Sequence, residues 1–116
     1  MSVAEKIPLC FRSNTQDSVT YFIGADFPAF NGHFEGNPLL PAVVQMGLCA
    51  DALGRLQHKK YEISKISRAK FMHPILPGSE VSVQIVSRAD GQFLGTLSTP
   101  QTHDKLSQMI FSVKEL

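Results

Sequence analysis

The sequence predicts an α+β fold in which an antiparallel sheet wraps around one long buried helix. Two observations predict this class. The segment from Pro41 to about His58 has a helical pattern and is apolar almost all round, so protein must surround it. Most of the remaining chain consists of short alternating runs rich in β-branched and aromatic residues, which Gly, Pro and Asn clusters separate. A chain of 116 residues suffices for one domain, expected over residues 1–116.

The elements before the helix are one strand and one long loop. Val19, Tyr21 and Ile23 alternate with other residues, which predicts a strand over Ser18–Ala25. Residues 26–41 hold three prolines, two glycines and two asparagines, a composition typical of a structured irregular loop. Such loops often carry function when a rigid scaffold holds them. Pro41 suits the first position of the helix that follows, because its missing N–H would be unpaired there.

Four antiparallel strands are expected after the helix. They lie at Glu62–Met72, around Val81–Ile85, at Gln92–Ser98 and at Leu106–Val113. Asp90-Gly91 predicts a type I′ hairpin turn between the second and third of these strands, because both central positions of that turn need a positive φ.

The composition argues against several classes of protein. The 43% hydrophobic and 18% charged residues can form a folded core, which disfavours disorder. The net charge of +1 disfavours a nucleic-acid partner. No apolar run approaches the roughly 20 residues that span a membrane, and residues 1–8 do not look like a secretion signal. We expect a cytoplasmic protein in which Cys10 and Cys49 are free thiols.

The loop before the helix carries His33. A helix N-terminus presents unpaired N–H groups and a partial positive charge, which can hold a carbonyl oxygen that gains negative charge. A neutral histidine nearby can take a proton from the carbon beside that carbonyl. The alternative is a histidine whose ring only braces the loop.

Two stretches resemble the signatures of one family. Residues 30–46 read Phe-Asn-Gly-His-Phe-Glu-Gly-Asn-Pro-Leu-Leu-Pro-Ala-Val-Val-Gln-Met, and residues 70–81 read Lys-Phe-Met-His-Pro-Ile-Leu-Pro-Gly-Ser-Glu-Val. In the same order, both resemble the hotdog-fold β-hydroxyacyl-acyl-carrier-protein dehydratases, and the likeness extends over about residues 18–113. The short dehydratase-like relatives of specialised lipid and aryl-polyene pathways look more similar than the housekeeping enzymes. The resemblance implies a hotdog fold and a 3-hydroxyacyl-thioester dehydratase-like activity. No spacing of His, Cys or carboxylate residues suggests a metal site and no glycine-rich nucleotide motif is present, so no cofactor is expected.

The resemblance also implies roles for individual residues. His33 would remove the α-proton of a 3-hydroxyacyl thioester, and the helix N-terminus would polarise the thioester carbonyl. The residues expected to contact the substrate are Phe34, Gly36, Ala42, Val43, Gly47 and Phe71. The substrate would be a thioester of acyl carrier protein or coenzyme A. Two protomers would pair with sites at their interface, as a homodimer, a higher oligomer of dimers or a heterodimer.

The helix departs from the family pattern at Gly47, where the family carries the Glu or Asp that protonates the leaving hydroxyl. The nearest acid is Asp51, which lies four residues on and therefore on the same helical face. We predict that Asp51 reaches the hydroxyl directly or through a water. The alternative is a carboxylate that bonds Arg55, its own i+4 partner. The missing side chain of Gly47 also opens space for a bulkier acyl or aromatic group, or for a water.

Two other functions stay open at this point. One is a hotdog thioesterase in which Asp51 activates a water, and the other is a non-catalytic subunit that serves an active paralogue. Six of the eleven basic residues lie between Arg55 and Lys70. This basic run is either a solvated face or a surface that steers an acidic carrier protein or coenzyme A.

Overall fold

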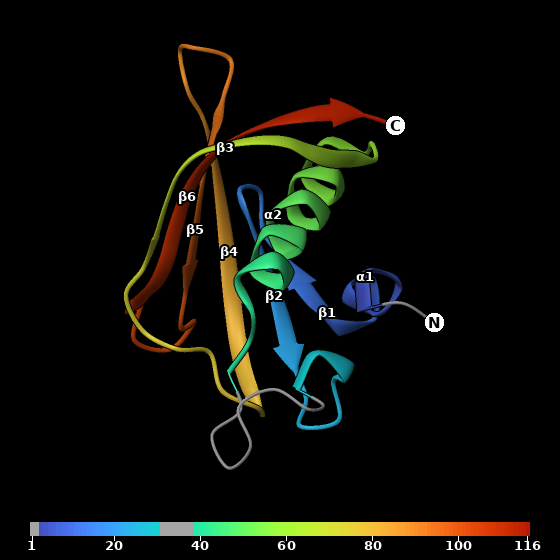
Figure 1. Cartoon of the computed structure of the whole chain (residues 1–116), viewed down its shortest axis with the longest axis vertical. Coiled ribbons are helices and arrows are strands. Elements are labelled where there is room, and N and C mark those ends of the chain that lie inside the picture. The colour runs from blue at the N-terminus through green and yellow to red at the C-terminus, as the bar shows by residue number, and fades with distance from the viewer. Residues whose placement is uncertain (1–2, 31–38) are drawn as a thin grey trace.

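The computed structural model describes residues 3–30 and 39–116 (Figure 1). The elements before the long helix are α1 (Val3–Lys6), the 3-10 turn η1 (Ile7–Cys10), β1 (Phe11–Asn14), β2 (Ser18–Ile23) and the 3-10 turn η2 (Pro28–Phe30). The long helix α2 (Ala42–Gln57) is followed by β3 (Tyr61–Phe71), β4 (Ser79–Ser87), β5 (Phe93–Ser98) and β6 (Lys105–Glu115).

The strands form one antiparallel sheet of six strands in the order β1-β2-β4-β5-β6-β3. Helix α2 lies across one face of this sheet (Figure 1), so the predicted α+β arrangement is confirmed. Strand β3 lies at an edge of the sheet and pairs with β6, with two shifts of register along its length. Of the helices in the described ranges, none is both long and apolar enough to cross a membrane.

The core lies between the sheet and α2 because the alternating strands send one set of side chains toward the helix. Val19 and Tyr21 of β2 are fully buried beside Val81 and Val83, their register partners on β4. The helix contributes a row of buried side chains that meets them, namely Val44, Leu48, Cys49, Ala52 and Leu53.

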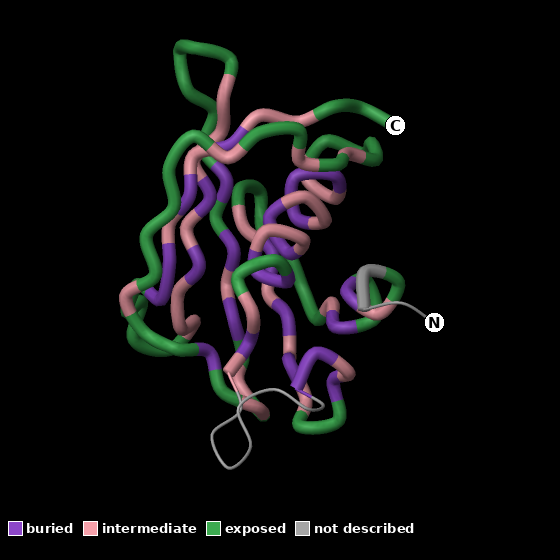
Figure 2. The backbone as a smooth tube through the Cα atoms, viewed as in Figure 1, coloured by how far each residue is buried: buried purple, intermediate pink, exposed green. Residues whose placement is uncertain are grey.

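The burial of α2 is one-sided (Figure 2). Leu48 is fully buried, whereas Val43 is 72% exposed and Met46 and Ala50 are partly exposed. Within the described residues, the sheet covers one face of this helix, so the apolar residues of the other face meet little of this chain. Whether protein also covers the second face stays a prediction.

The sequence missed three short N-terminal elements and misassigned one turn. It did not predict α1, η1 or β1, which are four-residue elements too short to show a periodicity. The Asp90-Gly91 hairpin exists, but its turn is not type I′, because Gly91 has a positive φ of 83° and Asp90 does not. Instead, Gly91 donates its N–H to the carbonyl of Arg88 at 3.2 Å, and Arg88 donates to the carbonyl of Gln92 at 2.9 Å. The longer loop needs one left-handed residue, and glycine supplies it.

Candidate functional site

A hollow of about 470 Å³ lies at the N-terminus of α2, between that helix end and the end of β3. Ala42, Phe71 and His73 are among the residues that line it. The N–H groups of Val44 and Gln45 donate to the carbonyl of Pro41 at 3.1 and 3.2 Å. The N–H groups of the first turn have no carbonyl a turn earlier in the helix, so this end of α2 offers donors and a partial positive charge.

Gln45 fixes the chain at the entry to this helix. It is 5% exposed, its Nε2 donates to the carbonyl of Leu40 at 3.2 Å, and its Oε1 accepts a bond from the Ser107 hydroxyl at 2.7 Å. The Leu40 N–H in turn donates to the carbonyl of Ile75 at 2.9 Å. The residue just before Pro41 is thus tied to both the sheet and the helix. Gln45 matches the family pattern, but the sequence analysis assigned it no role. The signal that could have indicated one is a polar amide within an otherwise apolar helix.

A second hollow of about 440 Å³ follows the exposed face of α2, and we call it the helix groove. Val43, Met46, Gly47, Ala50 and Asp51 line it from the helix. Ile7 and Pro8 form one side and residues 61–63 of β3 form the other. The groove begins one residue after Ala42 of the first hollow, so both hollows lie along the same helix.

Ile7 occupies the space that Gly47 leaves. A Cβ atom added at Gly47 would lie 2.5 Å from Cδ1 of Ile7, closer than real Cβ atoms approach their neighbours. Ile7 itself is 6% exposed. The space that the sequence analysis assigned to substrate or water is therefore partly filled, at the helix surface, by a side chain from η1.

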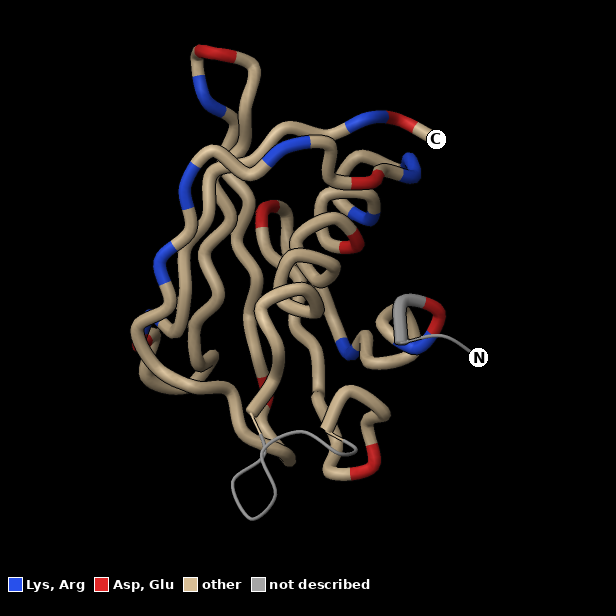
Figure 3. The backbone as a smooth tube through the Cα atoms, viewed as in Figure 1, with Lys and Arg blue, Asp and Glu red and all other residues tan. Residues whose placement is uncertain are grey.

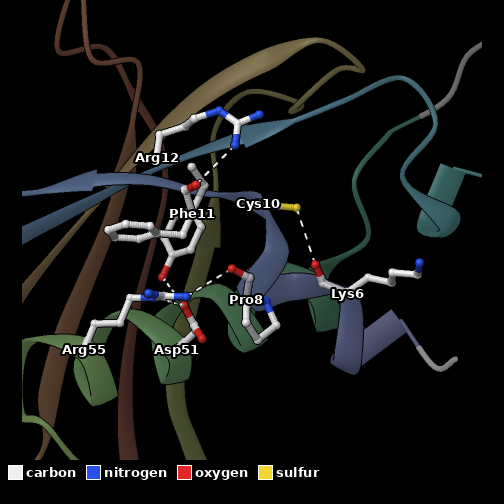
Figure 4. A network of polar contacts seen from close by, with 8 residues as sticks. Lys6, Pro8, Cys10, Phe11, Arg12, Asp51 and Arg55 are labelled. Atoms are coloured by element: carbon white, nitrogen blue, oxygen red, sulfur yellow. Dashed lines mark hydrogen bonds and ion pairs between the residues drawn. The ribbon is translucent and has the colours of Figure 1, made fainter.

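Asp51 anchors a polar network that reaches the N-terminal segment (Figure 4). Its Oδ2 accepts hydrogen bonds from the Tyr21 hydroxyl at 2.6 Å and from Nε of Arg55 at 2.8 Å. Nη2 of Arg55 donates to the carbonyl of Pro8 at 3.0 Å, and the guanidinium lies 4.1 Å from the centre of the Phe11 ring. Burial and the bond to Asp51 raise the pKa of Tyr21, which keeps its hydroxyl protonated as a donor.

The structure thus shows the i+4 pairing of Asp51 with Arg55 that was the alternative to catalysis. The side chain of Asp51 is still 18% exposed and lines the helix groove. Within the part of the chain that the structure describes, no hydrogen bond is made to its Oδ1. A role of Asp51 as proton donor therefore stays a prediction.

The predicted site residues divide into three sets. His33, Phe34 and Gly36 lie outside the described residues. Ala42 and Phe71 line the hollow at the helix N-terminus, whereas Val43, Gly47 and Asp51 line the helix groove. Cys49 is a packed core thiol, as expected, and burial raises its pKa to about 12.

Comparison with known proteins identifies the family. The model of a family described as ApeI-like, ApeI dehydratase, matches residues 11–109. The chain belongs to the ApeI-like family. This finding confirms the predicted family resemblance.

Two curated relatives of this ApeI-like protein are 3-hydroxyacyl-[acyl-carrier-protein] dehydratases FabZ. The one from Haemophilus influenzae is 35% identical over 79 residues, which cover 60% of this chain and 53% of the relative. The one from Mannheimia succiniciproducens is 34% identical over 88 residues, which cover 66% and 59%. The chain thus matches little more than half the length of these relatives.

Solved structures confirm the predicted hotdog fold. The dehydratase heterocomplex ApeI:P from Xenorhabdus doucetiae matches with a TM-score of 0.72 and 22% identity, over 89% of this chain and 92% of that chain. A hypothetical thioesterase with coenzyme A from Streptococcus pneumoniae matches with a TM-score of 0.58 and 10% identity, over 91% of this chain and 84% of that chain. These similarities show the fold alone, so the activity must be argued from the site.

Proposed function

We propose that this ApeI-like protein is a 3-hydroxyacyl-acyl-carrier-protein dehydratase in which His33 is the base. The observation that carries the proposal is the hollow at the N-terminus of α2, whose lining begins at Leu39, a few residues after His33 in the sequence. The FabZ relatives support the same reaction, since their names specify a 3-hydroxyacyl-[acyl-carrier-protein] dehydratase.

In the proposed reaction, the N–H groups of Ala42 and Val43 bind the carbonyl oxygen of the thioester. Removal of the α-proton places negative charge on that oxygen, and the helix N-terminus stabilises it. His33 accepts the α-proton, and the electrons of the broken C–H bond form the new C=C bond. The hydroxyl group at C3 takes up a proton and leaves as water, so the products are an enoyl thioester and one water.

The hydroxyl at C3 also needs a proton donor, and Asp51 is proposed for that role. Asp51 lies eight residues after Val43, about 12 Å along the helix axis, so it is proposed to serve the site of a second protomer. Its exposed edge faces the helix groove, and Asp51→Asn tests this role. If Asp51 is the acid, this variant loses dehydration and keeps substrate binding. If Asp51 has only the structural role of holding Arg55, the variant retains turnover.

The carrier protein is proposed to dock on β3. Figure 3 shows Lys and Arg positions spaced along this strand, and Lys65, Arg68 and Lys70 are exposed. Among the residues that the structure describes, none of these three forms a salt bridge within the chain. The strand ends at Phe71, which lines the hollow at the helix N-terminus. An acidic carrier on β3 would therefore place its pantetheine arm close to the proposed catalytic hollow.

The proposal includes a second protomer and a cytoplasmic setting. The outer edge of β3, which pairs with no other strand among the described residues, offers an edge for a second protomer. The related ApeI:P structure is a heterocomplex, which supports a heterodimer, and a homodimer is the alternative. Mass measurement of the purified chain, alone and with a dehydratase paralogue, distinguishes the two.

The deciding experiment incubates the protein with a 3-hydroxyacyl thioester and a plain acyl thioester of the same carrier. Enoyl absorbance and free thiol are followed together. A dehydratase forms the enoyl product without releasing thiol, and His33→Ala abolishes this without loss of the folded state by circular dichroism. Release of thiol with no enoyl product would refute the proposal in favour of a thioesterase. Activity that appears only after a paralogue is added would identify a non-catalytic subunit.

A further inference from the structure

The N-terminal segment contributes a side chain to the helix groove. We propose that Ile7 is a specificity-determining residue, which shortens the groove and limits the length of the acyl chain that binds there. The inference rests on the proposed function, because it takes the occupant of the groove to be the acyl chain of the thioester.

The floor of the groove runs away from the helix N-terminus. Val43, Gly47 and Ala50 are spaced by four and three residues, so they lie on one face of α2. Val43 belongs to the first turn, where the thioester carbonyl is proposed to bind, so an acyl chain leaving that carbonyl enters the groove. At a rise of 1.5 Å per residue, Val43 and Ala50 are about 10 Å apart along the helix axis.

Ile7 narrows this path at its middle, from one side of the groove. Its Cδ1 lies 2.5 Å from the position that a Cβ atom of Gly47 would take, and Gly47 is about 6 Å from Val43 along the axis. An extended chain advances about 1.2 Å per bond, so the path before Ile7 holds about six carbons and the full path about ten. Ile7 therefore sets a limit near six carbons.

The position of Ile7 is fixed by the network around Asp51. Arg55 bonds the carbonyl of Pro8, the next residue, and Asp51 in turn fixes Arg55 and bonds Tyr21. Asp51 and Arg55 are thus positioning residues for the chain-length limit, whether or not Asp51 also transfers a proton. Arg55→Met is expected to loosen the segment and to shift the length preference in the same direction as a smaller residue at position 7.

The test measures binding rather than turnover, so its failure is distinguishable from failure of the proposed dehydration. Amide analogues of acyl-pantetheine with acyl groups of 4, 6, 8, 10 and 12 carbons are titrated calorimetrically into the wild-type protein, Ile7→Ala and Ile7→Val. Ile7→Val removes one methyl group and carries the test if Ile7→Ala does not fold. Leu9→Ala is the matched control, because Leu9 lies on the same turn, is 64% exposed and does not line the groove.

For the wild-type protein, affinity should rise up to about six carbons and then level off. For Ile7→Ala it should keep rising to about ten carbons, where the dissociation constant falls roughly 200-fold below the wild-type value, since each of the four newly buried methylenes strengthens binding about fourfold. Leu9→Ala should behave as wild type. The proposal is overturned if folded Ile7→Ala keeps the wild-type length profile, or if the wild-type protein binds none of the analogues. It is also overturned if Ile7→Ala changes only the oligomeric state, which would assign the groove to a second copy of the chain.

Discussion

The buried amide of Gln45 allows a sharp test of how the entry to α2 is built. Gln45→Ala removes the donor to the Leu40 carbonyl and the acceptor of the Ser107 hydroxyl, both in buried hydrogen bonds. A buried group that loses its partner costs about 1–3 kcal/mol. With two such groups and a small cavity, we expect the variant to lose about 2–4 kcal/mol of unfolding free energy.

The assay is urea denaturation at fixed protein concentration. With a denaturant slope of about 1–1.5 kcal/mol/M, the midpoint of Gln45→Ala should fall by about 2 M while the slope is unchanged. Ser107→Ala removes one of the two bonds and should cost about half as much. A double-mutant cycle of the two substitutions should give a coupling energy of about 1 kcal/mol. Gln84→Ala is the control, because its exposed amide bonds Asp17 at the surface and should change stability by less than about 0.5 kcal/mol.

Enzyme activity provides a second readout for the same variants. The segment with His33 ends next to Leu40, so Gln45→Ala should lower turnover even at temperatures where the variant is fully folded. A midpoint within about 0.3 M of wild type, with additive effects of Gln45→Ala and Ser107→Ala, would refute the claim that this amide holds the helix entry.

Three further predictions concern packing, charge and pH. Gly95→Ala should lower the melting temperature at a cost of about 1–3 kcal/mol, because its Cβ would lie 2.7 Å from Sγ of Cys49; an unchanged melting temperature would contradict this packing. The double variant Lys65→Glu/Arg68→Glu should raise KM for carrier-bound substrate and leave KM for a pantetheine substrate unchanged. Equal effects on both KM values would refute the proposal that the carrier docks on β3. Burial raises the pKa of the Cys49 thiol from 9.0 to about 12. The stability that the buried neutral thiol contributes is therefore complete below about pH 9 and is lost as pH rises toward 12, because the thiol ionises in the unfolded chain first. The urea midpoint should therefore decline over this range, and less steeply in Cys49→Ala.

The sequence predicted the elements whose periodicity repeats. Val19, Tyr21 and Ile23 alternate in the sequence and are fully buried, and α2 ends within a residue of the expected boundary. The apolar pattern predicted that the helix exists but not which of its faces stays exposed, because the exposed face depends on where the sheet ends. Val43 shows this, since it is as apolar as Val44 and is 72% exposed where Val44 is 3% exposed.

The features of the site that the sequence did not predict arise from contacts between distant segments. Gln45 meets Ser107 across a separation of 62 residues, and no local pattern encodes that bond. In the sequence, Gly47 indicates only that the carboxylate of the family pattern is missing. The structure shows that Ile7 packs against Gly47. The ion pair of Asp51 and Arg55 could be predicted as the alternative to catalysis by Asp51, because residues four apart in a helix are neighbours.

The central claim is that His33 removes the α-proton of a thioester held at the N-terminus of α2. The most direct measurement incubates a 3-hydroxyacyl thioester in deuterated water and follows, by mass spectrometry, both deuterium at the α-carbon and formation of the enoyl product. The account predicts enoyl product and α-deuterium with the wild-type protein and with His103→Asn, a surface control. It predicts neither with folded His33→Ala. Normal dehydration or α-exchange by His33→Ala would contradict the account.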